Sequence, residues 1–354
     1  MTSMTKWIGL GVLIVAFVFV AACERTVTTV EENTAPANCF GCHSDANTAL
    51  VAAEGQWANS KHASGENIER NFVPCVSCHT SEGFVRRVNG QPPATIVNPT
   101  AIHCFTCHAP HTKGVSADSL LLRVTAVQKL KNGESYDLHA ANICTACHQA
   151  RYSVHTEVAK DTLSERWGPH HSVQADMLLG TNGYEYEGYE YEQMVFHKTL
   201  TDNGCLDCHF ETTRNYILGG HSFNMAFDQE GTEVFNTAAC AKCHEEELED
   251  FNVDNVQTDV ETLIAQLETL LINANMLVYY PEEGAWLPPE RHVVSDDSVG
   301  AVWNYFMAKE DRSEGVHNSK YIKGLLESSI QFLQPELTST APSVAAGGDN
   351  KTAH

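Results

Sequence analysis

The sequence predicts a mainly α-helical and irregular fold with little β-structure and a helical C-terminal region. Three observations lead to this prediction. A Cys-x-x-Cys-His spacing recurs six times between residues 39 and 244. The chain between these repeats holds too few apolar residues to build ordinary sheets or long helices. After residue 250, apolar residues return at the three- and four-residue spacing of amphipathic helices.

The first residues predict an export signal and a lipid anchor. Lys6 precedes an uncharged, mostly apolar run from Trp7 to Ala22, which is short for a membrane-spanning helix and typical of a signal peptide. Cys23 follows in the context Val-Ala-Ala-Cys, which resembles a bacterial lipoprotein site. We therefore expect residues 1–22 to be a lipoprotein signal peptide, Cys23 to carry lipid, and the polar residues 23–38 to form a tether. The alternatives are a retained membrane anchor, or ordinary cleavage that leaves Cys23 as a spare thiol.

Twelve of the thirteen cysteines form the six motifs, which we number 1 to 6 in chain order. The cysteine pairs are Cys39 and Cys42, Cys75 and Cys78, Cys104 and Cys107, Cys144 and Cys147, Cys205 and Cys208, and Cys240 and Cys243. The histidines that follow them are His43, His79, His108, His148, His209 and His244. A zinc ribbon or a redox dithiol needs the cysteine pair but no histidine directly after it.

Histidine accounts for only 18 of 354 residues, so its presence after all six cysteine pairs is not explained by chance. Cys-x-x-Cys-His is the spacing of c-type haem attachment, in which two thiols bond to one porphyrin and the histidine binds its iron. We therefore expect six covalently bound haems c, with zinc or dithiol chemistry as the minor alternative. Residues 39–250 then form the haem-binding region, with a core made largely of porphyrin.

The opposite face of each iron decides its chemistry. A second histidine gives a six-coordinate centre that passes electrons, whereas an open face can bind a substrate. Twelve histidines lie outside the motifs, more than six distal positions require, which favours histidine on both faces. The predicted distal ligands are His62, His111, His171, His197, His221 and His317. The alternates are His170, His139 and His103.

The C-terminal region, residues 251–334, predicts three helices. Leucines, isoleucines and valines recur at helical spacing over residues 255–278, and two further helices are expected near residues 297–309 and 317–332. We expect the first to pack on haem edges. Residues 335–354 lack periodicity and predict a disordered tail.

Charge and one acidic segment bear on partners. A net charge of −23 counts against nucleic-acid binding and suits either a well-solvated surface or a basic redox partner. From Tyr184 to Glu192, aromatic and acidic residues alternate. This alternation predicts a solvated strand or hairpin with one aromatic face, and a calcium site or a partner patch is the alternative.

Several stretches resemble multihaem cytochromes c related to ammonia-forming nitrite reductases and their octahaem relatives. They are CHAPH (107–111), GPHHSVQADMLLGTNGYEY (168–186), FHKTLTDNGCLDCH (196–209), GGHSF (219–223) and NYFMAKEDRSEGVHNSKYIKGLLE (304–327). The resemblance implies closely packed haems and a helical C-terminal region, and it supports the same six distal histidines. The nitrite reductases use Cys-x-x-Cys-Lys at the catalytic haem, whereas all six motifs here end in histidine.

These observations favour electron transfer in the periplasm or at the cell surface, as in extracellular respiration. The expected partners are quinol-linked donors or other cytochromes, an outer-membrane conduit or an extracellular acceptor. Two alternatives stay open. One is a reductase or oxidase of a small nitrogen or sulfur compound, which needs an open haem. The other is a homo-oligomer or a subunit of an extracellular cytochrome filament.

Overall fold

The computed structural model describes residues 46–110, 121–160, 162–192, 197, 201–244, 248–290, 292–293 and 295–339. These residues belong to one compact unit that begins at Asp45. The predicted signal peptide, Cys23, the tether, motif 1 and His111 lie outside the described residues. Within the described part of the chain, no helix is both long enough and apolar enough to cross a bilayer.

The helices before residue 250 are short, and four of them carry haem motifs. The α-helices are α2 (Thr48–Ala58), α3 (Lys61–Ser64), α4 (Val76–His79), α5 (Ser81–Val88), α6 (Cys104–Cys107), α7 (Asn142–Thr145), α8 (Val154–Val158), α9 (Gln174–Leu179) and α11 (Cys205–His209). The 3-10 turns are η2 (His139–Ala141), η3 (Gly220–Ser222), η4 (Thr237–Lys242) and η5 (Val253–Asn255). Motifs 2, 3 and 5 coincide with α4, α6 and α11 to within one residue, whereas motifs 4 and 6 begin on α7 and η4 and end just beyond them. A helical turn brings residues three apart to one face, so each local turn presents its two thiols together.

Strands occur only as two-stranded antiparallel pairs in the described residues, which confirms the prediction of little β-structure. The strands are β1 (Gln128–Lys129), β2 (Ser135–Tyr136), β3 (Thr162–Leu163), β4 (Ala226–Gln229), β5 (Thr232–Phe235), β6 (Val278–Tyr280), β7 (Ala285–Leu287) and β8 (His292–Val293). Three pairs are hairpins of consecutive strands, and β3 pairs with the distant β8. The β3–β8 pair ties the middle of the chain to its C-terminal region.

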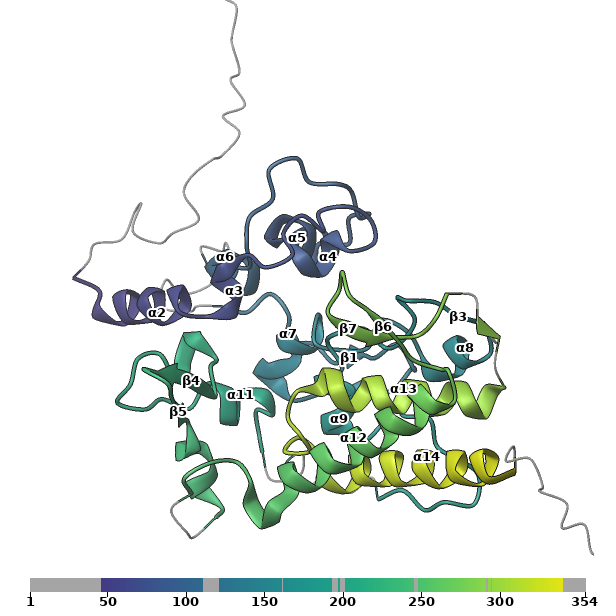
Figure 1. Ribbon diagram of the computed structural model, residues 1–354. Helices are drawn as coiled ribbons and strands as arrows, with labels where there is room; N and C mark the ends of the chain where they lie inside the picture. The colour runs from purple at the N-terminus through teal and green to yellow at the C-terminus, as the bar shows by residue number, and fades with distance from the viewer. Residues whose placement is uncertain are drawn as a thin grey trace, which may run out of the picture. The chain divides into compact units, whose positions relative to one another are not determined.

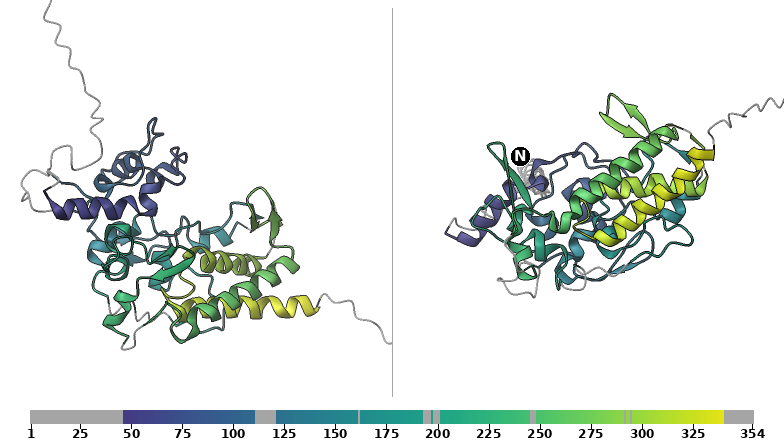
Figure 2. Two further views of the ribbon diagram at one scale, coloured as in Figure 1. Left: turned by 60° about the vertical axis from the view of Figure 1, so that its left-hand side comes forward. Right: turned by 60° about the horizontal axis from the view of Figure 1, so that its bottom comes forward.

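Three long helices form the C-terminal region: α12 (Val256–Asn273), α13 (Asp296–Asp311) and α14 (Ser319–Ser339). They pack on one another, and α13 also contacts α8 and α9. Figures 1 and 2 show the three helices side by side. Their buried side chains join Val154, Leu163 and Met177 in the largest hydrophobic cluster. This cluster is made of protein side chains, and α12 packs on α13 and α14 within it. The packing of this region on haem edges and a porphyrin-dominated core both stay predictions.

Two helix boundaries differ from the expected ones. The helix expected over residues 255–278 ends at Asn273, because Asn275 has a left-handed φ of 57° and the chain then enters β6. The last helix continues to Ser339, past the point at residue 335 where we expected a disordered tail. The helix expected near residues 297–309 is confirmed as α13.

The segment from Tyr184 to Glu192 is not a strand. The Tyr184 amide donates to Asn304 Oδ1 at 2.8 Å, and the Tyr191 hydroxyl donates to Ser328 Oγ at 2.9 Å. Gly300 on α13 permits this, because a Cβ there would lie 2.1 Å from the Tyr184 ring. The tyrosines therefore pack onto α13 and α14. Among the described residues, no cluster of three acidic, histidine or cysteine side chains could hold a metal ion such as calcium.

Candidate haem-binding site

Four motif histidines each face a second histidine from a distant part of the chain. The distances between ring centres are 6.2 Å for His79 and His170, 6.3 Å for His108 and His221, 6.1 Å for His148 and His62, and 6.3 Å for His209 and His317. No two partners share a secondary-structure element. The fold therefore pairs the histidines of motifs 2, 3, 4 and 5 with one distal candidate each.

The spacing fits an iron held between two imidazoles. A metal–imidazole bond of about 2 Å, plus about 1 Å from the nitrogen to the ring centre, puts two axial rings about 6 Å apart. Other aromatic pairs in the structure lie at similar separations, but these four pairs each join a motif histidine to a non-motif histidine from a distant segment, which ordinary aromatic packing does not require. The ten described motif cysteines are all free of disulfides. The residues present therefore fit c-type haem at motifs 2 to 5.

The outer nitrogen of several of these histidines is hydrogen-bonded in a way that fixes the tautomer. His148 Nδ1 lies 3.2 Å from Gln174 Oε1, His209 Nδ1 lies 3.0 Å from the Phe223 carbonyl oxygen, and His317 Nδ1 lies 2.8 Å from Asp311 Oδ1. Each partner atom is an acceptor, so each Nδ1 carries the proton and donates. The lone pair of Nε2 is then free for a metal, which is the arrangement found around metal-bound histidines.

Electrostatics keep several of these rings neutral, as metal ligands must be. Burial lowers the pKa of His62 to about 4, with a further contribution from His148. Burial also lowers the pKa of His170 and of His209 to about 4 each. His317 differs, because the adjacent carboxylate of Asp311 outweighs the effect of burial and raises its pKa.

His170, not His171, faces the motif 2 histidine. The backbone of His170 is left-handed, with a φ of 77°, and its ring lies 4.9 Å from that of His171, but only the His170 ring lies opposite His79. The His171 ring is 64% exposed and its Nδ1 lies 2.7 Å from Glu310 Oε2. This changes our first choice of distal ligand from His171 to the alternate, His170.

The other candidates have different surroundings. His103 is the N-cap of α6, and its Nδ1 accepts the Phe105 amide at 3.2 Å. This leaves the proton of the neutral ring on Nε2, which argues against His103 as an iron ligand. His139 is exposed at the start of η2. His197 donates from Nδ1 to the Val316 carbonyl oxygen at 2.7 Å, the same arrangement as in the paired histidines.

Thiols of different motifs also meet. Cys78 of motif 2 and Cys147 of motif 4 lie close enough to shift each other's pKa, and the Arg87 guanidinium approaches both sulfurs, at 3.6 and 3.9 Å. Cys144 of motif 4 and Cys205 of motif 5 likewise shift each other's pKa. Motif 4 therefore lies between motifs 2 and 5, an arrangement that the order of the motifs along the chain does not predict.

Asp176 is a buried carboxyl group that binds the backbone just after motif 4. It is fully buried, accepts from the Ala150 amide at 2.7 Å and from Asn182 Nδ2 at 3.0 Å, and burial raises its pKa to about 6. A pKa raised in the folded state contributes stability that is complete below pH 4 and lost as pH rises through 6. Between pH 7.5 and 4.5, the free energy of unfolding should therefore rise by about 2 kcal/mol more in the native protein than in Asp176→Asn.

Chemical denaturation at the two pH values measures this difference. The matched control is Glu282→Gln, which changes an exposed carboxylate in the turn between β6 and β7 and should show the same pH dependence as the native protein. Equal pH dependence in the native protein and in Asp176→Asn would contradict the assignment of a buried, weakly acidic carboxyl to Asp176.

Comparison with known proteins gives relatives of one kind. No family model matches the chain. The C-type polyheme cytochrome OmcC of Geobacter sulfurreducens is 23% identical over 321 residues, covering 78% of this chain and 38% of OmcC. OmcB of the same species, also a C-type polyheme cytochrome, is 23% identical over 309 residues, covering 75% of this chain and 38% of OmcB. The chain thus spans well under half the length of these curated relatives.

A solved structure shares the fold. The crystal structure of the outer cell wall cytochrome OcwA superposes with a TM-score of 0.52 at 20% identity, covering 80% of this chain and 50% of OcwA. The relatives found by sequence are multihaem c-type cytochromes, and the chain has the fold of a cytochrome. Both findings agree with the histidine pairs and the free motif cysteines.

Proposed function

We propose that this chain is a six-haem c-type cytochrome that carries electrons and does not transform a bound substrate. The single observation that carries the proposal is the set of four histidine pairs at metal-bridging distance, which leaves no open iron face at motifs 2 to 5. Haem supplies one-electron chemistry at its iron, while the protein sets the reduction potential through ligands, burial and hydrogen bonds. Motifs 1 and 6 then take His111 and His197 as their remaining distal candidates.

The thiol contacts support an order for the relay. With haem attached, each motif cysteine would bond to the edge of a porphyrin, so motifs whose cysteines lie close together would bring the edges of two haems near each other. The contacts of motif 4 with motifs 2 and 5 give the order 2–4–5. Cys208 of motif 5 also lies near Cys240 of motif 6, and Cys107 of motif 3 lies near Cys144 of motif 4. We infer a path from motif 2 through 4 and 5 to 6, with motif 3 as a branch at motif 4.

The cellular role follows from residues outside the described part of the chain. Residues 1–23 have the pattern of an export signal with a lipid on Cys23. Export also fits a c-type cytochrome, because c-type haem is attached outside the bacterial cytoplasm. The strongly negative charge suits a basic protein or an extracellular acceptor as redox partner. We propose a place at the outer face of the cell envelope, consistent with relatives such as OcwA, whose name places that protein in the outer cell wall.

Electron paramagnetic resonance of the oxidised holoprotein tests the proposal. We expect low-spin ferric signals that account for six haems, no high-spin signal, and no carbon monoxide binding after reduction. Mass spectrometry of the same sample should show six attached haems. A high-spin haem that binds nitrite or hydroxylamine would contradict the proposal and favour a reductase.

A further inference from the structure

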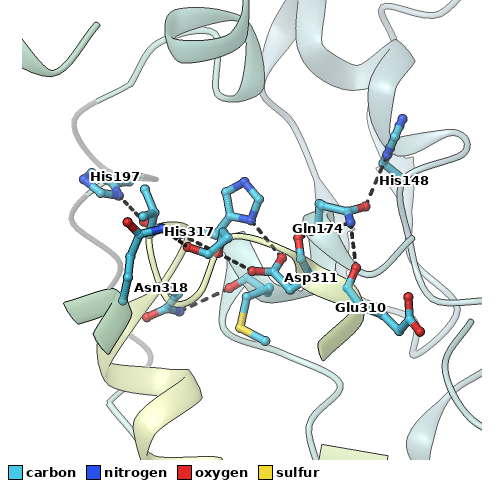
Figure 3. A network of polar contacts seen from close by, with 11 residues as sticks. His148, Gln174, His197, Glu310, Asp311, His317 and Asn318 are labelled. Atoms are coloured by element: carbon cyan, nitrogen blue, oxygen red, sulfur yellow. Dashed lines mark hydrogen bonds and ion pairs between the residues drawn. The ribbon is translucent and has the colours of Figure 1, made fainter. Parts of the chain in front are cut away.

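We propose that Asp311 is a positioning residue that lowers the reduction potential of the motif 5 haem relative to the motif 4 haem. The inference rests on the proposed function, since it concerns the iron between His209 and His317. It goes beyond that function by assigning a residue that tunes the potential of one site in the relay. The evidence is the set of hydrogen bonds around the axial histidines in Figure 3.

Asp311 is held against His317 by the end of α13. Its side chain is 2% exposed, its Oδ1 accepts from His317 Nδ1 at 2.8 Å, and its Oδ2 accepts from the Ser313 hydroxyl. Arg312 adopts a left-handed φ of 58°, which ends α13 and turns the chain back. The His317 amide donates to Ser313 Oγ at 3.2 Å, so the same turn holds both partners of the bond.

The motif histidines of motifs 4 and 5 donate from Nδ1 to neutral acceptors. His148 donates to an amide oxygen of Gln174, and His209 donates to a backbone carbonyl of Phe223. Gln174 also donates to the carbonyl oxygens of Glu310 and Asp311, at 3.0 and 3.3 Å. The end of α13 therefore contacts Gln174, the hydrogen-bond partner of the motif 4 histidine, and His317, the proposed distal ligand of motif 5. Of these two, only His317 meets a carboxylate there (Figure 3).

A carboxylate acceptor changes how much electron density an imidazole donates to its metal. A hydrogen bond to a charged acceptor is roughly twice as strong as a neutral one and draws the Nδ1 proton away from the ring. The ring then donates more electron density from Nε2, and losing an outer partner of this kind typically costs a metal site about 10–100-fold in affinity or activity. Ferric iron gains more from that density than ferrous iron does, so reduction of the motif 5 haem becomes harder.

The proposed transfer between motifs 4 and 5 moves one electron. With haem bound, one electron would pass from motif 4 to motif 5, with His148, His62, His209 and His317 retained as ligands and no bond made or broken. By lowering the potential of motif 5, Asp311 would make transfer from motif 4 to motif 5 less favourable and onward transfer from motif 5 more favourable.

The test is Asp311→Asn in the full-length holoprotein, measured by a potentiometric titration followed optically and by electron paramagnetic resonance. Asparagine keeps the shape and an acceptor oxygen for His317 but removes the charge. We expect one of the six one-electron steps to shift about tenfold in its equilibrium constant toward the ferrous form, which is about 59 mV. The g-values of one low-spin haem should change with it, while all six haems stay attached and low-spin.

Two further variants make the test decisive. Glu310→Gln removes a neighbouring carboxylate that pairs with His171, and it should leave the motif 5 step within about twofold of the native value. Ser313→Ala removes a hydrogen bond that shares the Asp311 charge, and it should move the motif 5 step toward the ferric form, even if Asp311→Asn fails to fold. The inference is overturned if Ser313→Ala shifts no step, or if Asp311→Asn folds and shifts none. A high-spin haem in the native protein would instead overturn the proposed function.

Discussion

Replacing His170 with glycine should open one haem and leave the others unchanged. His170 faces His79 across 6.2 Å, so its removal takes the distal ligand from motif 2 while Cys75 and Cys78 still hold the porphyrin. Glycine adopts the left-handed backbone of this position, a φ of 77°, more readily than histidine does, so the substitution removes a ligand without straining the chain. We expect a high-spin ferric signal from one of six haems and the binding of about one carbon monoxide per reduced protein.

The neighbouring residue provides the matched control. His171→Gly removes an imidazole of the same size one residue later, but that ring is 64% exposed and pairs with Glu310. It should give no high-spin signal and no carbon monoxide binding. If His171→Gly opened a haem and His170→Gly did not, the sequence-based choice of His171 would be right and the structural assignment wrong.

This pair also shows what local sequence can and cannot supply. The Cys-x-x-Cys-His spacing identifies the attachment residues because both thiols and the histidine lie on one helical turn, as on α11. The distal ligand comes from elsewhere in the chain, and the adjacent residues do not determine whether His170 or His171 lies opposite His79.

The partners of the ligands were missed for the same reason. Asp311 and Gln174 carry no motif, and Gln174 lies 26 residues from the histidine it contacts. The three C-terminal helices were predictable because periodic apolar residues report burial directly. The Tyr184–Glu192 segment was not, because its alternation resembles a strand while Asn304 and Ser328, on α13 and α14, provide its hydrogen bonds. Local pattern thus predicted the helices and the attachment sites, and tertiary contacts decided the rest.

The second large effect is expected at Trp303, in the protein core that holds the Asp311–His317 turn. Trp303 on α13 is fully buried, its ring meets Trp167 edge-on at 5.7 Å, and its indole donates to the Asn182 carbonyl oxygen at 2.7 Å. Trp303→Ala should lower the free energy of unfolding by about 3–5 kcal/mol, because it leaves a large cavity and a buried carbonyl without its donor. Denaturant unfolding followed by far-ultraviolet circular dichroism measures this loss.

The matched control is Trp286→Ala on β7. This ring is only partly buried at the margin of the same cluster, and it makes an edge-to-face contact with Tyr279. Because less apolar surface leaves water there, the loss should be less than half that of Trp303→Ala. Both variants keep their haems, since thioether attachment does not depend on either tryptophan. A Trp303→Ala loss no larger than that of Trp286→Ala would mean that the haems, and not the α12–α14 side chains, supply the stability of the C-terminal region. The axial position of His317 would then be held by the iron alone.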